Sequence, residues 1–206
     1  MNALTLVCFA VPQEAQPFQK LIRGRAEVRV LITGMGARQA ERAVREALCE
    51  LRPARVFTCG FAGALNPALV IGEVVCPRET TWAGAKPVVF HCASRVATTV
   101  AEKSALRAQT GADVVEMESA VITRVCRAAG VECVTLRAIS DTAHEDLPLD
   151  FNALMTADEK LSPLKLALAV LKAPQKIPAL LRLGRNSATA AARLAEVLQR
   201  TLQGVP

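Results

Sequence analysis

The sequence predicts an α/β fold in which a central mixed, largely parallel β-sheet is flanked by helices and followed by a helical C-terminal tail. Up to about residue 150, short apolar runs rich in β-branched residues alternate with segments of helical periodicity. Strands without polar alternation are typical of a sheet buried on both faces. With 206 residues, 51% of them hydrophobic, we expect a single domain over residues 1–206, in which 151–206 form a basic helical C-terminal extension.

The expected elements follow one another along the chain. Continuous apolar runs predict strands at 4–11, 28–33, 55–59, 73–76, 114–115 and 131–139. Apolar residues recurring on one face predict a helix over 37–51, and a second one over about 119–129 is closed by Gly130. After Asp150 we expect helical segments that end at Pro163, Pro174 and Pro178, and a last helix over 186–202.

Composition argues against several classes of protein. The seven cysteines show no C-x-x-C pair, and His91 and His144 have no partner at ligand spacing. We therefore expect neither disulfides nor a metal site, and we predict a cytoplasmic protein. The net charge of +6 suggests a nucleic-acid partner, but the aromatic fraction is only 3%. Because bases need aromatic platforms to stack on, we expect no nucleic acid.

The positive charge is concentrated near the C-terminus. From residue 160 to residue 193 every charged residue is basic: Lys160, Lys165, Lys172, Lys176, Arg182, Arg185 and Arg193. One interpretation is a pair of helices that covers the sheet edge and turns a basic face to solvent. The other is an interfacial element that contacts the inner membrane surface peripherally, with leucines in the lipid and cations at anionic headgroups.

A glycine turn, "TGMGARQA", follows the second predicted strand and opens a helix. It is similar to the dinucleotide-binding fingerprint, but Gln39 holds the third glycine position and strand 55–59 ends without the acid that would bind a ribose. We therefore expect no dinucleotide cofactor. The amides of Gly34 and Gly36, with Arg38, are candidates for holding an anion at the helix N-terminus.

Acids and glycines follow the other strands. Glu14 comes after the first strand, Gly60 and Phe61 lie in a second glycine turn, "CGFAGALNP", and "ADVVEMESA" carries Glu116 and Glu118. The strand in "LRAISD" ends in Ser140 and Asp141. Because ligands of open α/β sheets lie beyond the carboxyl ends of the strands, these residues predict one pocket.

Together these motifs resemble a known superfamily. "VVEMESA" and "RAISD", with "GMG", "CGFAGAL" and "IGEVV" upstream, are similar to the purine nucleoside phosphorylases and methylthioadenosine/S-adenosylhomocysteine nucleosidases from Leu4 to about Asp146. The tail "LKAPQKIPALLRLGRN" resembles the hopanoid-associated branch. The resemblance implies cleavage of the N-glycosidic bond of a purine nucleoside, a 5′-modified adenosine, by a homo-oligomer without a cofactor. Inorganic phosphate would be a co-substrate if the reaction is phosphorolysis.

The resemblance also assigns roles to the residues. Glu118 would bind the ribose hydroxyls, Met117 would pack against the sugar, Asp141 would protonate purine N7 and Glu14 would activate water. These residue types suit a reaction in which the ribose becomes an oxocarbenium ion and the base leaves as an anion. The dipole of the helix beginning at Ser119 should keep Glu118 ionised. In an extended segment, Glu116 and Glu118 would point to one side, with Glu116 in support, and Met117 to the other.

Three departures leave alternatives open. Phe61 stands where the nucleosidases carry serine, and Thr58 and Phe61 stand where the phosphorylases hold phosphate. The segment between "IGEVV" and "EMES" is also shorter than in the nucleosidases. Either water or phosphate therefore remains a candidate nucleophile. The alternative function is a non-catalytic nucleoside- or lipid-binding protein on the same fold.

Overall fold

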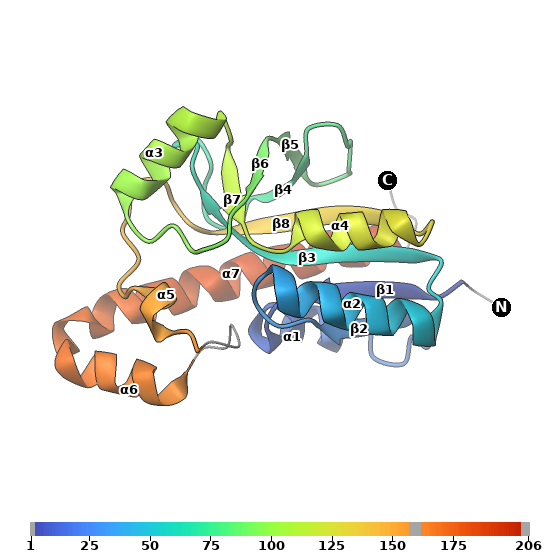
Figure 1. The fold of residues 1–206 in the computed structure, drawn as a ribbon, viewed down its shortest axis with the longest axis horizontal. Coiled ribbons are helices and arrows are strands. Elements are labelled where there is room, and N and C mark those ends of the chain that lie inside the picture. Colours follow the sequence, from blue (N-terminus) through green and yellow to red (C-terminus); the bar gives the residue numbers. More distant parts are fainter. Residues whose placement is uncertain (1–2, 157–161, 203–206) are drawn as a thin grey trace.

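The computed structural model describes residues 3–156 and 162–202 and confirms the predicted fold class. A mixed sheet lies between helices on its two faces, and a long C-terminal helix runs along one of them (Figure 1). The strands are β1 (Thr5–Phe9), β2 (Val28–Ile32), β3 (Arg55–Ala64), β4 (Val74–Pro77), β5 (Lys86–Val88), β6 (Phe90–Cys92), β7 (Val114–Glu116) and β8 (Glu132–Asp141). The helices are α1 (Pro12–Leu21), α2 (Ala37–Leu51), α3 (Val100–Thr110), α4 (Ser119–Ala128), α5 (Phe151–Leu154), α6 (Pro163–Lys172) and α7 (Ile177–Leu202).

The main sheet has the order β2-β1-β3-β8-β4-β5. Strands β1, β2, β3 and β8 are parallel, whereas β4 runs antiparallel to β8. At the far end of β3, β7 pairs antiparallel with Gly63 and Ala64 and continues the sheet to β6. The carboxyl ends of β1, β3 and β8 therefore meet at one edge, which is where the candidate site forms.

Both faces of the sheet are buried, which explains the continuous apolar strands. In β1, Leu6 and Cys8 pack against α2 and α4, and Val7 and Phe9 pack against α1 and α7. Alternate residues of one strand thus enter two different cores. A strand whose side chains are apolar on both faces is typical of the central layer of a three-layer fold.

The second glycine turn is the main correction to the expected strands. Residues 60–64 do not form a turn, because β3 continues through them to Ala64 with a register shift between Ala62 and Gly63. This shift lets β3 pair with β8 along its length while its end pairs with β7. Because these glycines have no side chain, the side chains of other elements can approach this part of β3 closely.

Two helices escaped the sequence analysis. Helix α1 begins directly after the first strand, with prolines at positions 12 and 17 that obscure its pattern. Helix α3 begins at a capping box in which Thr99 accepts a bond from the Glu102 amide and Glu102 bonds back to the Thr99 amide. Helix α2 has the predicted bounds.

Pro163 and Pro178 lie in the first turns of helices, so the expectation that they end helices was wrong; at Pro174 it is confirmed, because α6 ends at Lys172 just before this proline. Pro163 starts α6, Pro174 starts a 3₁₀ turn over Pro174–Lys176, and Pro178 lies in the first turn of α7, where a missing N–H costs nothing. The last helix consequently begins at Ile177, nine residues before the predicted start at 186. Within the described residues, no helix combines the length and apolar character needed to cross a membrane.

Candidate active site

A cavity of about 230 Å³ lies beyond the carboxyl ends of β1, β3 and β8. Its wall includes four acids from three separate places in the sequence: Glu14, Glu116, Glu118 and Asp141. The predicted residues Phe61, Met117 and Ser140 also line it. Among the described residues of this wall, Arg95 is the one basic side chain, and it is largely exposed and paired with Glu102.

Glu14 is held in the first turn of α1. One carboxylate oxygen accepts bonds from the amides of Ala10 (2.9 Å) and Val11 (3.2 Å), and the other accepts from the amide of Phe61 (2.9 Å). Burial raises the pKa of this carboxyl, although the three amides and the charge of Arg137 act in the opposite direction. A buried carboxylate of raised pKa is a stronger proton acceptor than an exposed one.

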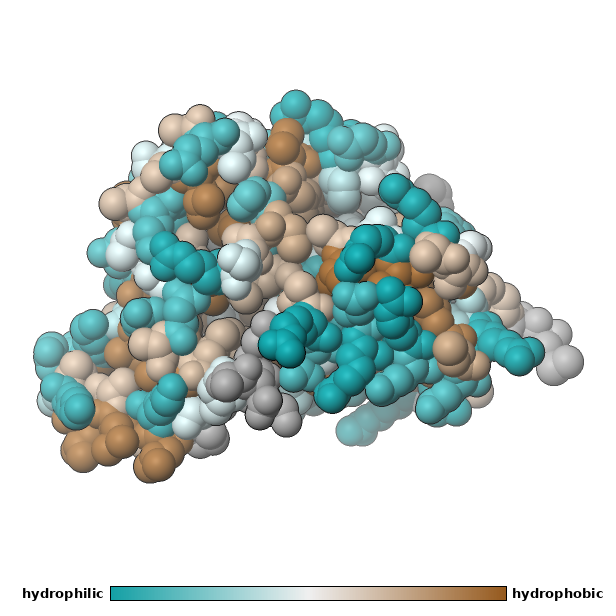
Figure 2. Space-filling model, in the orientation of Figure 1, coloured by the Kyte–Doolittle hydropathy of each residue, from teal (hydrophilic) through white to brown (hydrophobic). Residues whose placement is uncertain are grey.

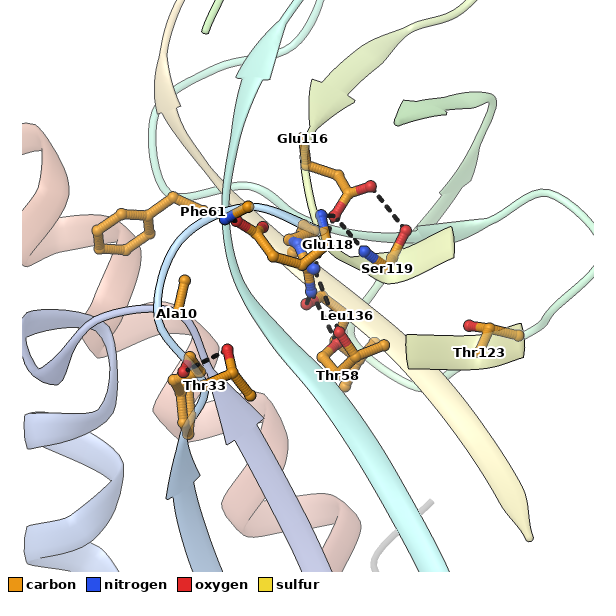
Figure 3. Close-up of polar contacts among 12 residues, drawn as sticks. Ala10, Thr33, Thr58, Phe61, Glu116, Glu118, Ser119, Thr123 and Leu136 are labelled. Carbon is orange, nitrogen blue, oxygen red and sulfur yellow. Dashed lines mark hydrogen bonds and ion pairs between the residues drawn. The ribbon is translucent and has the colours of Figure 1, made fainter. Parts of the chain in front are cut away.

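Gly60 and Phe61 accommodate Glu14 on β3. A Cβ atom at position 60 would lie 2.9 Å from Glu14 Oε1, so a larger residue there would displace the carboxylate. The Phe61 ring packs against the core formed with α1 and α7, while its amide serves Glu14. In Figure 3 this ring points away from Glu116 and Glu118. The bulk of Phe61 therefore leaves the space between the acids open.

Glu116 forms a buried ion pair with Arg137, which the sequence analysis did not identify as a site residue. Arg137 Nη2 lies 2.7 Å from Glu116 Oε2, and both side chains are 1% exposed. The same carboxylate accepts bonds from the amide and hydroxyl of Ser119 (2.8 and 2.7 Å; Figure 3). Burial opposes ionisation, but the Arg137 charge and these bonds together lower the pKa of Glu116.

Arg137 also connects the acids to β3. Its guanidinium donates to the carbonyl and hydroxyl oxygens of Thr58 at 2.8 and 3.2 Å. Its position inside the apolar run "VTLRAIS" could have identified Arg137 from the sequence, because a buried arginine needs a carboxylate partner. Arg137 thus supplies fixed positive charge beneath Glu14, Glu116 and Glu118.

Glu118 lies at the N-cap of α4 but bonds elsewhere. Its Oε1 accepts the amide proton of Gly36 at 2.8 Å. Enclosure in the cavity raises its pKa to about 7, against the opposing effects of Arg137 and Gly36 and with a smaller contribution from the charges of Glu116 and Glu14. Burial therefore favours the neutral form of Glu118, in the direction opposite to the helix dipole, which was expected to favour the anion.

The turn after β2 was expected to hold an anion, but its backbone amides already donate hydrogen bonds within the chain. Gly34 donates its amide to the Ala10 carbonyl at 3.1 Å, and Gly36 donates to Glu118. The Arg38 side chain is exposed and is absent from the described wall of the cavity. Met35, between the two glycines, does line the cavity, although nothing in the sequence singled it out.

Asp141 closes the opposite side of the cavity. Its Oδ1 accepts the Ser140 hydroxyl proton at 2.8 Å, and its Oδ2 forms an ion pair with Lys103 at 2.7 Å. Lys103 comes from α3, a helix that was not predicted, so no sequence signal connected it to the site. A Cβ atom on Gly63 would lie 3.0 Å from Asp141 Oδ2, which explains a small residue at that point of β3.

Met117 does not point away from its neighbouring acids. Strand β7 ends at Glu116, and the chain bends at residues 117 and 118 before α4 begins. All three side chains consequently line the same cavity. The alternation expected of an extended segment fails because the strand is already over.

A cavity at the carboxyl ends of three parallel strands, lined by four acids and bordered by a glycine turn at a helix N-terminus, is typical of a nucleoside phosphorylase-like protein. The family model of the phosphorylase superfamily matches residues 8–91 and 85–172, and the chain belongs to that superfamily. It is similar to the 5′-methylthioadenosine/S-adenosylhomocysteine nucleosidase of Actinobacillus succinogenes, with 26% identity covering 70% of this chain and 80% of the relative.

Two further proteins are similar to parts or to the fold of this chain. A shorter stretch is 40% identical to the aminodeoxyfutalosine nucleosidase of Campylobacter jejuni and covers 30% of this chain and 27% of that protein. The structure of the futalosine hydrolase of Helicobacter pylori superimposes with a TM-score of 0.73 over 99% of both chains, at 16% identity. At that identity the structural likeness establishes the fold alone.

Proposed function

We propose that this protein hydrolyses the N-glycosidic bond of a purine nucleoside. The observation that carries the proposal is the arrangement of three carboxyl groups in one cavity, with Glu14 on α1, Glu118 before α4 and Asp141 at the end of β8. They come from three separate elements and differ in their partners: backbone amides for Glu14, one amide for Glu118 and a lysine for Asp141. Different environments give carboxyl groups different tasks.

The reaction divides among these groups as follows. As the bond between C1′ and N9 breaks, its electron pair leaves with the purine, and Asp141 delivers a proton to N7. Glu118 accepts hydrogen bonds from the ribose hydroxyls and offsets the positive charge that develops on the sugar. Glu14 takes a proton from the attacking water, whose oxygen bonds to C1′. The products are the free base and ribose.

The charge of the cavity favours water over phosphate as the nucleophile. Four acids line the wall, and the one lining cation among the described residues, Arg95, is paired with Glu102. The turn amide of Gly36, a candidate phosphate contact, already serves Glu118. A phosphate dianion would enter a negative site with few donors, whereas a water molecule meets a ready base in Glu14.

The substrate class is proposed to be a 5′-modified adenosine, which the name of the Actinobacillus succinogenes relative supports. A second candidate function, binding of a nucleoside without turnover, is favoured by one contact. Lys103 Nζ lies 2.7 Å from Asp141 Oδ2, so one oxygen of the proposed proton donor is already engaged in an ion pair.

One experiment separates these possibilities. The protein is incubated with adenosine, 5′-methylthioadenosine and inosine, each with and without inorganic phosphate, and free base is quantified. Release without phosphate supports hydrolysis, and release only with phosphate indicates a phosphorylase. Binding by calorimetry without any release would replace the proposal with the binding function, and neither binding nor release would overturn both.

A further inference from the structure

We infer that α6 and the first half of α7 form a surface that binds anionic lipid bilayers. This surface consists of Leu164, Leu168, Leu171, Ile177 and Leu181 with the cations Lys165, Lys172, Lys176, Arg182 and Arg185. It lies apart from the residues that line the acidic cavity, so the inference is independent of the proposed reaction.

The apolar part of this surface is unusually exposed. Leu164 is 70% exposed, Leu171 77% and Leu181 58%. Half of the large hydrophobic residues that are exposed in the described chain fall between residues 164 and 181. Figure 2 shows a brown, hydrophobic area at the lower left of the molecule, where α6 lies in Figure 1. Contiguous apolar surface of this kind marks a contact with another apolar body.

Helix geometry gathers these residues on one side. Leu164, Leu168 and Leu171 are spaced four and three residues apart, so they share one face of α6. The second half of α7 behaves differently: Ala190, Leu194 and Leu198 are buried in the main core. The α6 region extends beyond the sheet in Figure 1, so its apolar face is left outside this core.

The charges of the surface select its partner. All five cations are exposed, and no acid occurs between residues 162 and 195. Lys165 donates to carbonyl oxygens at the end of α5, and Arg182 lies 3.6 Å from Glu145. For Lys172, Lys176 and Arg185 the described residues provide no ion-pair partner. Exposed leucines beside unpaired cations are complementary to a bilayer with anionic headgroups.

A second copy of the chain fits this surface less well. A symmetric contact would place the same cations opposite one another in a partly desolvated interface, where like charges repel. An anionic bilayer neutralises the cations and accepts the leucines at the same time. The binding should accordingly weaken with salt, because headgroup attraction is screened over about 8–10 Å at 0.1–0.15 M.

The test is co-sedimentation of the full chain with vesicles of phosphatidylcholine alone or mixed with phosphatidylglycerol. We expect binding to the anionic vesicles only, and less of it at high salt. The variant Lys172→Glu/Lys176→Glu should bind at least ~25-fold more weakly, since each cation near such a surface contributes about fivefold. Leu171→Asp should also weaken binding, whereas Val70→Asp, at a valine 61% exposed on another part of the molecule, should not.

Each variant is checked for folding by its melting temperature, so that loss of binding is not confused with unfolding. Binding to neither vesicle, or equal binding by Val70→Asp and Leu171→Asp variants, would overturn the inference. Size-exclusion chromatography tests whether the surface binds a second copy of the chain instead. That would be the conclusion if the protein is an oligomer that Leu171→Asp dissociates and if it binds no vesicles.

Discussion

Lys103 Nζ lies 2.7 Å from Asp141 Oδ2, although the lysine has no exposed surface. Its other two protons go to the carbonyl oxygens of Thr142 (2.6 Å) and Glu145 (3.0 Å), both in the loop that follows Asp141. All three donors of the ammonium group are therefore used within one loop. Lys103 therefore fixes the position of the proposed proton donor relative to the loop that follows it.

Replacing Asp141 tests that donor directly. Asp141→Asn keeps the size of the side chain but cannot deliver a proton, so kcat for purine release should fall by about 10²–10⁴-fold. KM should change little if the sugar contacts are intact. A variant with parental kcat would remove Asp141 from the mechanism.

Lys103→Met should destabilise the protein by about 3–5 kcal/mol, because it leaves a carboxylate largely buried and unpaired. The control is Lys103→Met combined with Asp141→Asn, in which no charge is left unpaired and much of the loss should be recovered. Urea denaturation measures both variants. If the double variant is as unstable as the single one, packing of the lysine stem and not its charge is what matters.

The pH dependence of kcat/KM should reveal Glu118. Its pKa of about 7 lies above the usual 4.5, so Glu118 is mostly protonated at pH 6 and mostly ionised at pH 8. If ribose binding needs the ionised form, kcat/KM rises with pH through about 7 and then levels off. A profile that is flat between pH 6 and 8 would contradict this role.

Glu118→Gln should make the protein more stable at high pH while reducing its activity. Because the folded-state pKa is above the unfolded one, the parental stability is highest below about 4.5 and declines as pH rises through about 7. The glutamine stays neutral, so its advantage should grow to about 3 kcal/mol at pH 8 and vanish near pH 4. Thermal unfolding at the two pH values measures the difference.

Arg137 should be essential to the fold as well as to the site. Removing it by Arg137→Met leaves Glu116 charged and buried, at a cost of about 3–5 kcal/mol. Adding Glu116→Gln should restore part of that stability, because the remaining groups are neutral. The two-residue cycle, followed by urea denaturation, gives the coupling energy; a coupling near zero would mean that the 2.7 Å contact does not hold these strands together.

The sequence predicted the layers better than the details of the site. Leu6 to Phe9 identified a central strand because both faces of β1 are buried. By contrast, Lys103 was missed because its helix was missed, and its partner Asp141 is distant in sequence. The raised pKa of Glu118 was missed for a different reason: the dipole of α4 can be inferred from local sequence, whereas the burial that raises the pKa depends on elements that only the fold brings together.

The position of β8 in the sheet has a consequence for how the chain is made. Of the described strands, β8 is synthesised last. It nevertheless lies between β3 and β4 and pairs with both of them. A ribosome-bound chain that ends before residue 132 therefore presents open strand edges on both sides of the gap. The sheet and the acidic cavity can close only when about two thirds of the chain has emerged, so folding is expected to be late and cooperative, and vulnerable to aggregation during translation.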